Sequence, residues 1–136
     1  MGKITLKKAD HFAYLVSDMD RAIDFYQNKL GLKFLSRDMD EEHGEEFSFF
    51  EVEGGNLELL RILDSPSPQV NSLPPDKRAN CPHMAFEVDN LEEALAEFQN
   101  AGVEIQGGPY EIENKVKWAY MLDPDENILE LVNWLN

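Results

Sequence analysis

The sequence is short of cysteine and of long apolar runs, and both shortages narrow the class of protein. Cys81 is the only cysteine among 136 residues, so no disulfide can form within the chain. A reducing compartment is the simpler environment for such a chain. No apolar run approaches the roughly 20 residues of a membrane-spanning helix. Residues 1–6 contain no apolar signal core and do not match the N-myristoylation pattern. We therefore expect a cytoplasmic protein.

Positive charge is also scarce. Twelve Lys and Arg residues stand against 27 Asp and Glu residues, which gives a formal net charge of −15. Nucleic acids and anionic membrane surfaces both require a cationic face on their partner, so neither is an expected partner. The apolar fraction of 43% is ordinary for a globular protein, and 136 residues are enough for one domain with its own core.

The chain does contain an internal repeat. Matching residues recur at a constant offset of 72: Val16 with Val88, Ala22 with Ala94, and Leu57-Glu58-Leu59 with Leu129-Glu130-Leu131. A repeat in register over this length predicts two copies of one supersecondary unit. We expect module one at about 9–63, a proline-containing linker at about 64–80 and module two at about 81–134.

Each module has the pattern of a strand, a helix and three strands. In the first, we expect strands at 9–17, 33–39, 47–53 and 57–63, and a helix that starts at Ser17 or Asp18 and stops at Gly31. In the second, we expect strands at 82–88, 103–105, 116–122 and 127–134, with a break at Gly107-Gly108-Pro109 and a helix from Asp89 or Asn90 to Gly102. The fold class is therefore α+β, a single domain of two tandem βαβββ modules.

Two glutamates stand out because they interrupt apolar strands. Glu130 lies within Asn127-Ile128-Leu129-Glu130-Leu131-Val132, and Glu58 within Leu57-Glu58-Leu59-Leu60. A buried carboxylate without a partner is costly. Each glutamate also follows a histidine by 47 positions, namely His11 and His83. Four polar residues at repeat-equivalent places indicate a shared bound ion.

Strand alternation supports a metal site. It places each of the four side chains on the face of its sheet that the helix leaves open, and two sheets packed about a pseudo-twofold would bring them together in a cleft. Two imidazoles and two carboxylates suit one divalent ion, Ni²⁺, Co²⁺, Zn²⁺, Mn²⁺ or Fe²⁺. Taken singly, such a histidine is more often a core or rim residue, and such a glutamate can pair with Arg61 or a lysine. The occurrence of all four residues at repeat-equivalent positions favours a metal site over these structural roles.

Other side chains are candidates for holding a substrate. Trp118 and Tyr120 share a strand face and either line the pocket or pack in the core. Lys117 and Arg61, with Lys115, either grip an anionic substrate or belong to the solvated surface. The strong negative charge would not steer a highly anionic coenzyme A ester toward the site.

Four motifs resemble those of the vicinal oxygen chelate superfamily, the glyoxalase-type fold of paired βαβββ modules. They are Asp10-His11-Phe12-Ala13-Tyr14-Leu15-Val16-Ser17-Asp18, Ala22-Ile23-Asp24-Phe25-Tyr26, Pro82-His83-Met84-Ala85-Phe86-Glu87-Val88-Asp89 and the run from Leu122 to Leu131. The resemblance covers nearly the whole chain. It implies metal ligands at His11, Glu58, His83 and Glu130, and a small-molecule substrate that chelates the metal through neighbouring oxygens. It also implies a homodimer, with a site that is either within one chain or across the interface.

The complete ligand set resembles the isomerase and lyase branch, typified by lactoylglutathione lyase. That branch moves a proton between adjacent carbons through an enediolate, and the resemblance implies that Glu130 or Glu58 is the base, with Glu130 slightly favoured. Leu15 and Ile62 replace the polar glutathione anchors of that branch. The alternatives are a methylmalonyl-CoA epimerase-like enzyme, with Glu46 or Glu51 as an extra base, and a non-catalytic protein that sequesters an antibiotic or similar ligand.

Overall fold

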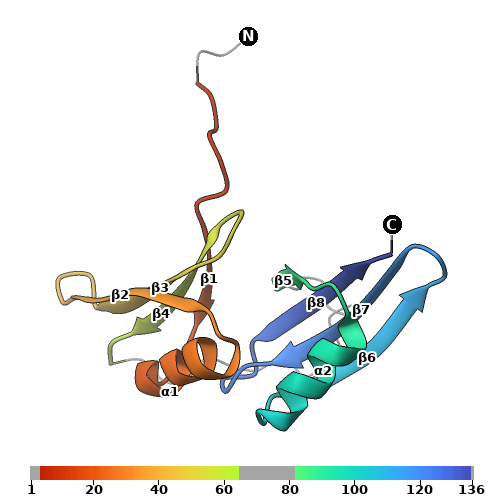
Figure 1. The fold of residues 1–136 in the computed structure, drawn as a ribbon. Coiled ribbons are helices and arrows are strands. Elements are labelled where there is room, and N and C mark those ends of the chain that lie inside the picture. The colour runs from red at the N-terminus through yellow and green to blue at the C-terminus, as the bar shows by residue number, and fades with distance from the viewer. Residues whose placement is uncertain (1–3, 65–81, 136) are drawn as a thin grey trace.

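The computed structural model describes residues 4–64 and 82–135, which form two βαβββ modules in succession (Figure 1). The first contains β1 (His11–Leu15), α1 (Met19–Asp24), η1 (Phe25–Lys29), β2 (Lys33–Asp40), β3 (Glu45–Glu51) and β4 (Asn56–Ile62). The second contains β5 (Met84–Glu87), α2 (Leu91–Asn100), β6 (Glu104–Ile112), β7 (Val116–Leu122) and β8 (Ile128–Trp134). The α+β class and the tandem repeat are confirmed. The expected linker lies outside the described residues from position 65 onward.

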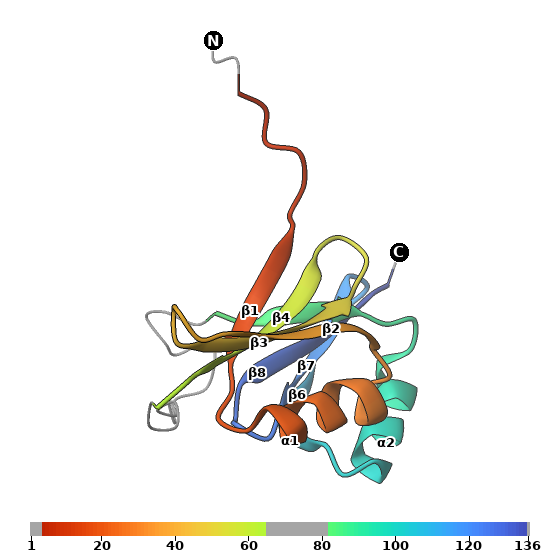
Figure 2. The ribbon, with the colours of Figure 1, turned by 90° about the vertical axis from the view of Figure 1, so that its left-hand side faces the viewer.

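Each module builds one four-stranded mixed sheet. The strand orders are β1-β4-β3-β2 and β5-β8-β7-β6, with the first pair of each sheet parallel and the other pairs antiparallel. Neither sheet closes into a barrel. The two sheets lie side by side, and α1 and α2 lie together on one side of them (Figures 1 and 2). No helix in the described ranges is long and apolar enough to cross a membrane.

The helices begin where the sequence predicts them. The side chain of Asp18 accepts a hydrogen bond from the backbone of Arg21, and the side chain of Asn90 accepts one from the backbone of Glu93, so both are N-caps. After Asp24 the first helix widens into the π-helical η1 segment, in which Leu30 N donates to Phe25 O.

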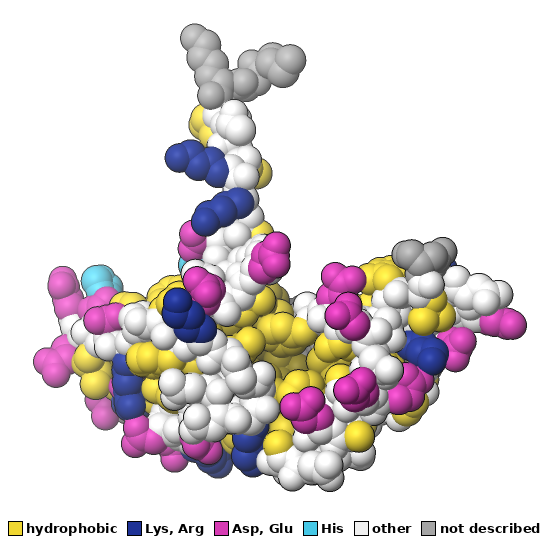
Figure 3. All heavy atoms as spheres, in the orientation of Figure 1, with side chains coloured by type: hydrophobic (Ala, Val, Ile, Leu, Met, Phe, Trp, Pro, Cys, Tyr) yellow, Lys and Arg dark blue, Asp and Glu magenta, His cyan; other side chains and the backbone are white. Residues whose placement is uncertain are grey.

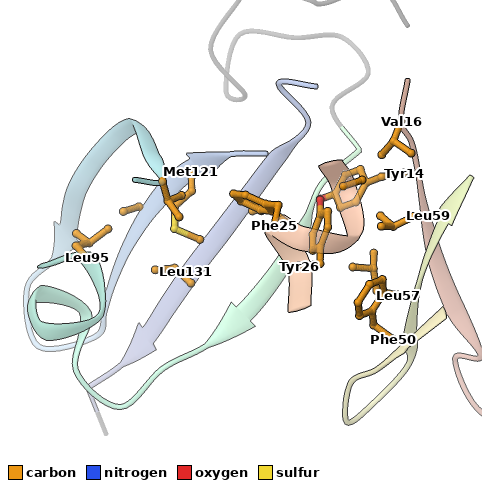
Figure 4. Close-up of a cluster of buried hydrophobic side chains, with 14 of the residues drawn as sticks. Tyr14, Val16, Phe25, Tyr26, Phe50, Leu57, Leu59, Leu95, Met121 and Leu131 are labelled. Atoms are coloured by element: carbon orange, nitrogen blue, oxygen red, sulfur yellow. The ribbon is translucent and has the colours of Figure 1, made fainter. Parts of the chain in front are cut away.

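One hydrophobic core joins the two modules. Phe25 points toward Leu131 and Met121 of the second module, whereas Tyr26 packs beside the first sheet (Figure 4). Leu57 and Leu59, on either side of Glu58, are fully buried in this core. Burying such side chains stabilises a fold by about 1.5–3 kcal/mol each, which fixes the opposite orientation for Glu58.

Polar contacts also connect the modules. The Tyr14 hydroxyl donates to Ile128 O at 2.5 Å and accepts from Met84 N at 2.6 Å. Asp123, in the turn before β8, accepts a 2.8 Å hydrogen bond from the Tyr26 hydroxyl, and others from Asp125 and Asn127 of its own turn. Burial raises the pKa of Asp123 although these hydrogen bonds favour its charged form. The Asp123 turn is therefore held to α1–η1 by a buried polar contact.

The predicted break at Gly107-Gly108-Pro109 is wrong. β6 continues from Glu104 to Ile112, with irregular register against β7 around Gly107 and before Tyr110. Gly108 has a φ of 95°, and a Cβ atom there would lie 3.0 Å from Ala119 Cα. The glycines permit a bulge where the backbones approach closely, so they distort the strand without ending it.

Replacing Tyr26 with Phe should weaken the junction between the modules. The substitution removes the hydrogen bond that the Tyr26 hydroxyl donates to Asp123, so we expect the free energy of unfolding to fall by about 1–3 kcal/mol in urea denaturation. Tyr110→Phe is the control, because its ring is nearly half exposed, and it should change stability by less than about 0.5 kcal/mol. Equal effects of the two variants would contradict a stabilising role for the Tyr26–Asp123 contact.

Candidate functional site

The first His–Glu pair lies on the face of the first sheet that α1 does not cover. β1 and β4 are parallel, and Ala13 lies opposite Glu58 in their register. His11, two residues before Ala13, shares that face. Its Nε2 atom lies 3.6 Å from Glu58 Oε1. The ring also meets the edge of Phe49 on β3, at a centroid distance of 5.5 Å.

The second sheet repeats this arrangement. β5 and β8 are parallel with Ala85 opposite Glu130, and His83 stands two residues before Ala85. His83 Nε2 lies 3.0 Å from Glu130 Oε1. Tyr120 on β7 is opposite Glu130, and its ring centroid is 5.8 Å from that of His83. The repeat in sequence is therefore a repeat of local geometry.

Asp10 contacts the candidate site through a hydrogen bond that the sequence analysis missed. Its Oδ2 atom lies 2.8 Å from His11 Nδ1, which leaves Nε2 directed toward Glu58. This hydrogen bond is the main cause of a lowered pKa for Asp10. Metal-binding histidines commonly have a carboxylate on the second ring nitrogen. The adjacent Asp-His pair in the sequence was the available signal.

The donor atoms fit a divalent metal. Two ligands about 2.1 Å from one ion stand about 3.0 Å apart at a right angle and about 3.4 Å apart at the tetrahedral angle. The His–Glu separations of 3.0 and 3.6 Å are close to these values. Both pairs reach solvent on the open faces, since the glutamate side chains are 16% and 18% exposed.

Each histidine lies beside its own glutamate, and a site shared by all four side chains stays a prediction. In residues 4–64 and 82–135 no group of three or more His, Cys, Asp and Glu side chains is placed to hold a metal. The physical reason is the side-by-side placement of the sheets, which the Tyr14 and Asp123 contacts maintain. Each chain thus presents two half-sites on two open faces.

The aromatic candidates lie near the second pair. Trp118 shares the open face with Tyr120 by strand alternation, and its register partner on β8 is Val132. Tyr110 of β6 packs against Trp118 at a centroid distance of 5.5 Å, which extends the aromatic surface beyond the residues that the sequence analysis named. Leu15 and Ile62 are partly exposed on the corresponding face of the first sheet. The walls of both half-sites are therefore largely apolar.

The basic candidates lie on the other faces of the sheets. Arg61 Nε donates to Glu46 Oε1 at 2.9 Å, on the side that carries Leu57 and Leu59. Lys117 Nζ donates to Glu92 of α2 at 2.7 Å. Both contacts favour a structural role over the substrate contact proposed from the sequence. Glu46 is likewise held on that side, which disfavours it as an extra base, whereas Glu51 shares the open face with Phe49.

Comparison with known proteins shows the family of this chain. The model of the Glyoxalase/Bleomycin resistance protein/Dioxygenase superfamily matches residues 8–131. The chain belongs to this superfamily. A relative, the mitochondrial methylmalonyl-CoA epimerase of Bos taurus, is 29% identical over 89% of this chain and 69% of its own.

Solved structures of the superfamily share the fold. A glyoxalase family protein from Bacillus cereus has a TM-score of 0.82 at 21% identity, covering 100% of this chain and 99% of its own. The trypanothione-dependent glyoxalase I of Leishmania major has a TM-score of 0.73 at 27% identity, covering 94% and 87%. The superfamily includes enzymes as well as resistance proteins, so membership fixes the fold and leaves the reaction to the site.

Glu46→Gln tests the structural assignment of Arg61. Burial acts to raise the pKa of Glu46, but hydrogen bonds from Arg37 and Arg61 outweigh it and leave the pKa below its usual value. The charged form therefore stabilises the fold above the unfolded pKa of about 4.3, and this contribution is lost as the pH falls through the lower folded pKa. We expect the variant to lose about 1–3 kcal/mol of unfolding free energy at pH 7.

The difference between the variant and the natural protein should shrink on acidification below about pH 4. Denaturation curves across pH measure it, with Glu42→Gln in an exposed turn as the control. A constant difference at every pH would contradict the ion-pair explanation.

Proposed function

We propose that the protein is a metal-dependent enzyme of the glyoxalase type. It would move a proton at a carbon next to a carbonyl group of a small oxygenated substrate. The observation that carries the proposal is the pair of matching His–Glu half-sites, with Nε2–Oε1 separations of 3.0 and 3.6 Å. A protein that only sequesters a ligand has no need of this donor set.

We further propose that a complete site forms between two chains. One chain would contribute His11 and Glu58, and its partner would contribute the residues equivalent to His83 and Glu130. The two pairs are separate within one chain, and both open faces expose apolar side chains such as Leu15 and Trp134. An apolar face on each copy favours association. Two-fold pairing would then produce two equivalent sites per dimer.

The residues of such a site have separable tasks. His11, Glu58, His83 and Glu130 would hold the ion, which polarises a substrate carbonyl and stabilises the negative charge that develops on oxygen. Glu130 or Glu58 would take the proton from the carbon with its carboxylate and return it to a carbon of the substrate. Asp10 would hold the ring of His11 in the orientation seen here. Tyr120 and Trp118 would exclude water from the reacting carbon.

The side chains that line the proposed site limit the possible classes of substrate. Leu15 and Ile62 are apolar and partly exposed where a polar thiol anchor is expected in lactoylglutathione lyases. These side chains favour a substrate with an apolar part over glutathione. Epimerisation of an acyl-CoA is the second candidate, because the bovine relative is named methylmalonyl-CoA epimerase. Both reactions begin with removal of a proton next to a carbonyl group.

Deuterium exchange tests the reaction without presupposing the product. The metal-loaded protein should incorporate deuterium from D₂O into a thiohemiacetal of methylglyoxal or into methylmalonyl-CoA, as measured by NMR. Glu130→Gln and Glu58→Gln should each be compared with the natural protein. In the variant that lacks the catalytic base, the metal should still bind while the exchange rate falls about 10²–10⁴-fold. A metal-loaded protein that exchanges neither substrate would move the assignment away from both reactions.

Mixing two inactive variants tests the two-chain site. One chain carries His11→Ala with Glu58→Ala, and the other carries His83→Ala with Glu130→Ala. Each variant alone should bind no metal tightly. In a randomly paired mixture, half of the dimers are mixed and each has one intact site, so metal binding should return to about a quarter of the natural capacity.

Calorimetric titration with Co²⁺ or Zn²⁺ measures this recovery. A mixture that forms mixed dimers but recovers no tight metal site would show that the four residues do not meet across chains.

A further inference from the structure

Residues 4–10 form an extended arm that leaves the body of the protein at the start of β1 (Figures 1 and 2). Its two large apolar side chains are almost fully exposed, Ile4 at 89% and Leu6 at 92%. In an extended segment these two residues share one side, and Thr5 and Lys7 share the other. Such a segment has an apolar edge that no part of its own described chain covers.

The base of the arm is fixed. Asn56 N donates to Asp10 O at 2.8 Å, and a Cβ atom at Gly55 would lie 3.3 Å from Ala9 O. The Asp10 side chain also contacts His11, a proposed metal ligand. The arm therefore leaves the body beside the first half-site, in a direction set by the β3–β4 turn.

The arm differs in charge from the rest of the protein. The first eight residues contain three lysines and no acidic residue, in a chain with a net charge of −15. Within the described residues, Lys7 and Lys8 form no ion pair. An exposed basic and apolar segment on a strongly acidic protein is complementary to the protein's own surface, which favours a second copy of the chain as its partner.

A matching surface lies at the far end of the second sheet. Four large apolar side chains are exposed there, and they belong to the end of β6 and the end of the chain: Tyr110, Ile112, Trp134 and Leu135. Ile112 and Trp134 are both register partners of Val116, so they belong to one cross-strand row. Glu113 lies in the turn that follows Ile112, with Lys115 next to it, whereas Glu111 is the register partner of Lys117 and faces the other side of the sheet. We call the four apolar residues Tyr110, Ile112, Trp134 and Leu135 the strip.

Magenta carboxylates and yellow apolar side chains adjoin one another over the second module, on the same side of the molecule from which the arm projects (Figure 3). Trp134 and Ile112 share the open face with Glu130 by strand alternation.

We infer that the arm of each chain docks on the strip of a second copy. Ile4 and Leu6 pack against the apolar row, and Lys7 and Lys8 lie near Glu113. This inference rests on the two-chain site proposed above and adds an interface outside the metal ligands. Because the arm begins at Asp10, docking also holds the carboxylate that orients His11.

Variants of the arm test its docking. Ile4→Ser with Leu6→Ser should raise the dimer dissociation constant at least about a hundredfold, because two apolar side chains from each of two arms lose their buried contacts. Thr5→Ser is the matched control and should leave the constant unchanged. Sedimentation velocity over a concentration series measures it. The fold of the monomer should not change, because all of these side chains are exposed in one chain.

Charge reversal tests the acceptor. Lys7→Glu with Lys8→Glu should weaken dimers by about three- to tenfold at low salt. Glu113→Lys lowers the net negative charge and thus the general repulsion between chains, yet it should also weaken dimers by facing the lysines of the arm. Combining this change with the two lysine changes should restore association. If Glu113→Lys alone strengthens dimers, the strip is not the acceptor and the inference is overturned.

Failure of this inference is distinguishable from failure of the proposed function. If arm variants leave the dissociation constant unchanged while the mixed variants still recover metal binding, the arm does not dock and the two-chain site stands. If the natural protein stays monomeric at every concentration, the arm inference and the two-chain site both fail, whereas deuterium exchange still tests the reaction separately.

Discussion

Each histidine stands beside its glutamate because the same parallel register occurs twice in the chain. Ala13 opposite Glu58 and Ala85 opposite Glu130 are equivalent pairs, with His11 and His83 two residues earlier on the same face. The flanking leucines of each glutamate must face the core, so the carboxylate must face away from it. The candidate site is therefore a consequence of core packing as much as of its own chemistry.

A second constraint decides what the two half-sites can do. The Tyr14 hydroxyl bridges β5 and β8, and Tyr26 binds the Asp123 turn, which together keep the two sheets side by side. Hydrogen bonds buried at such a junction are costly to break without replacement. One chain thus presents its two His–Glu pairs on two open faces, and the apolar side chains on those faces support the proposal that a second copy covers them. The basic arm differs in charge from the rest of this acidic protein, which supports the proposal that it docks on a second copy.

Much of the fold follows from local patterns. Asp18 and Asn90 cap helices where the sequence predicts a cap, and β7 has the predicted bounds, because both features depend on neighbouring residues. The alternation rule also explains why Arg61 faces away from Glu58 and Lys117 from Trp118, since residues an odd number of positions apart in a strand face opposite sides. The sequence analysis did not apply the rule to these two basic residues. The length of β6 was predicted wrongly because two glycines and a proline usually end a strand. Here they form a bulge against Ala119.

The sequence by itself determined the repeat, the spacing of each His–Glu pair and the strand face that each of these four side chains occupies. These depend on periodicity, on register between equivalent segments and on the burial of adjacent leucines. Only the tertiary structure decided that the pairs stay apart within one chain and that the arm stands free of the body. Those features depend on contacts such as Tyr14 with Ile128, which join residues 114 positions apart. Such contacts leave no local signal, because nothing in the pattern of either segment specifies its distant partner.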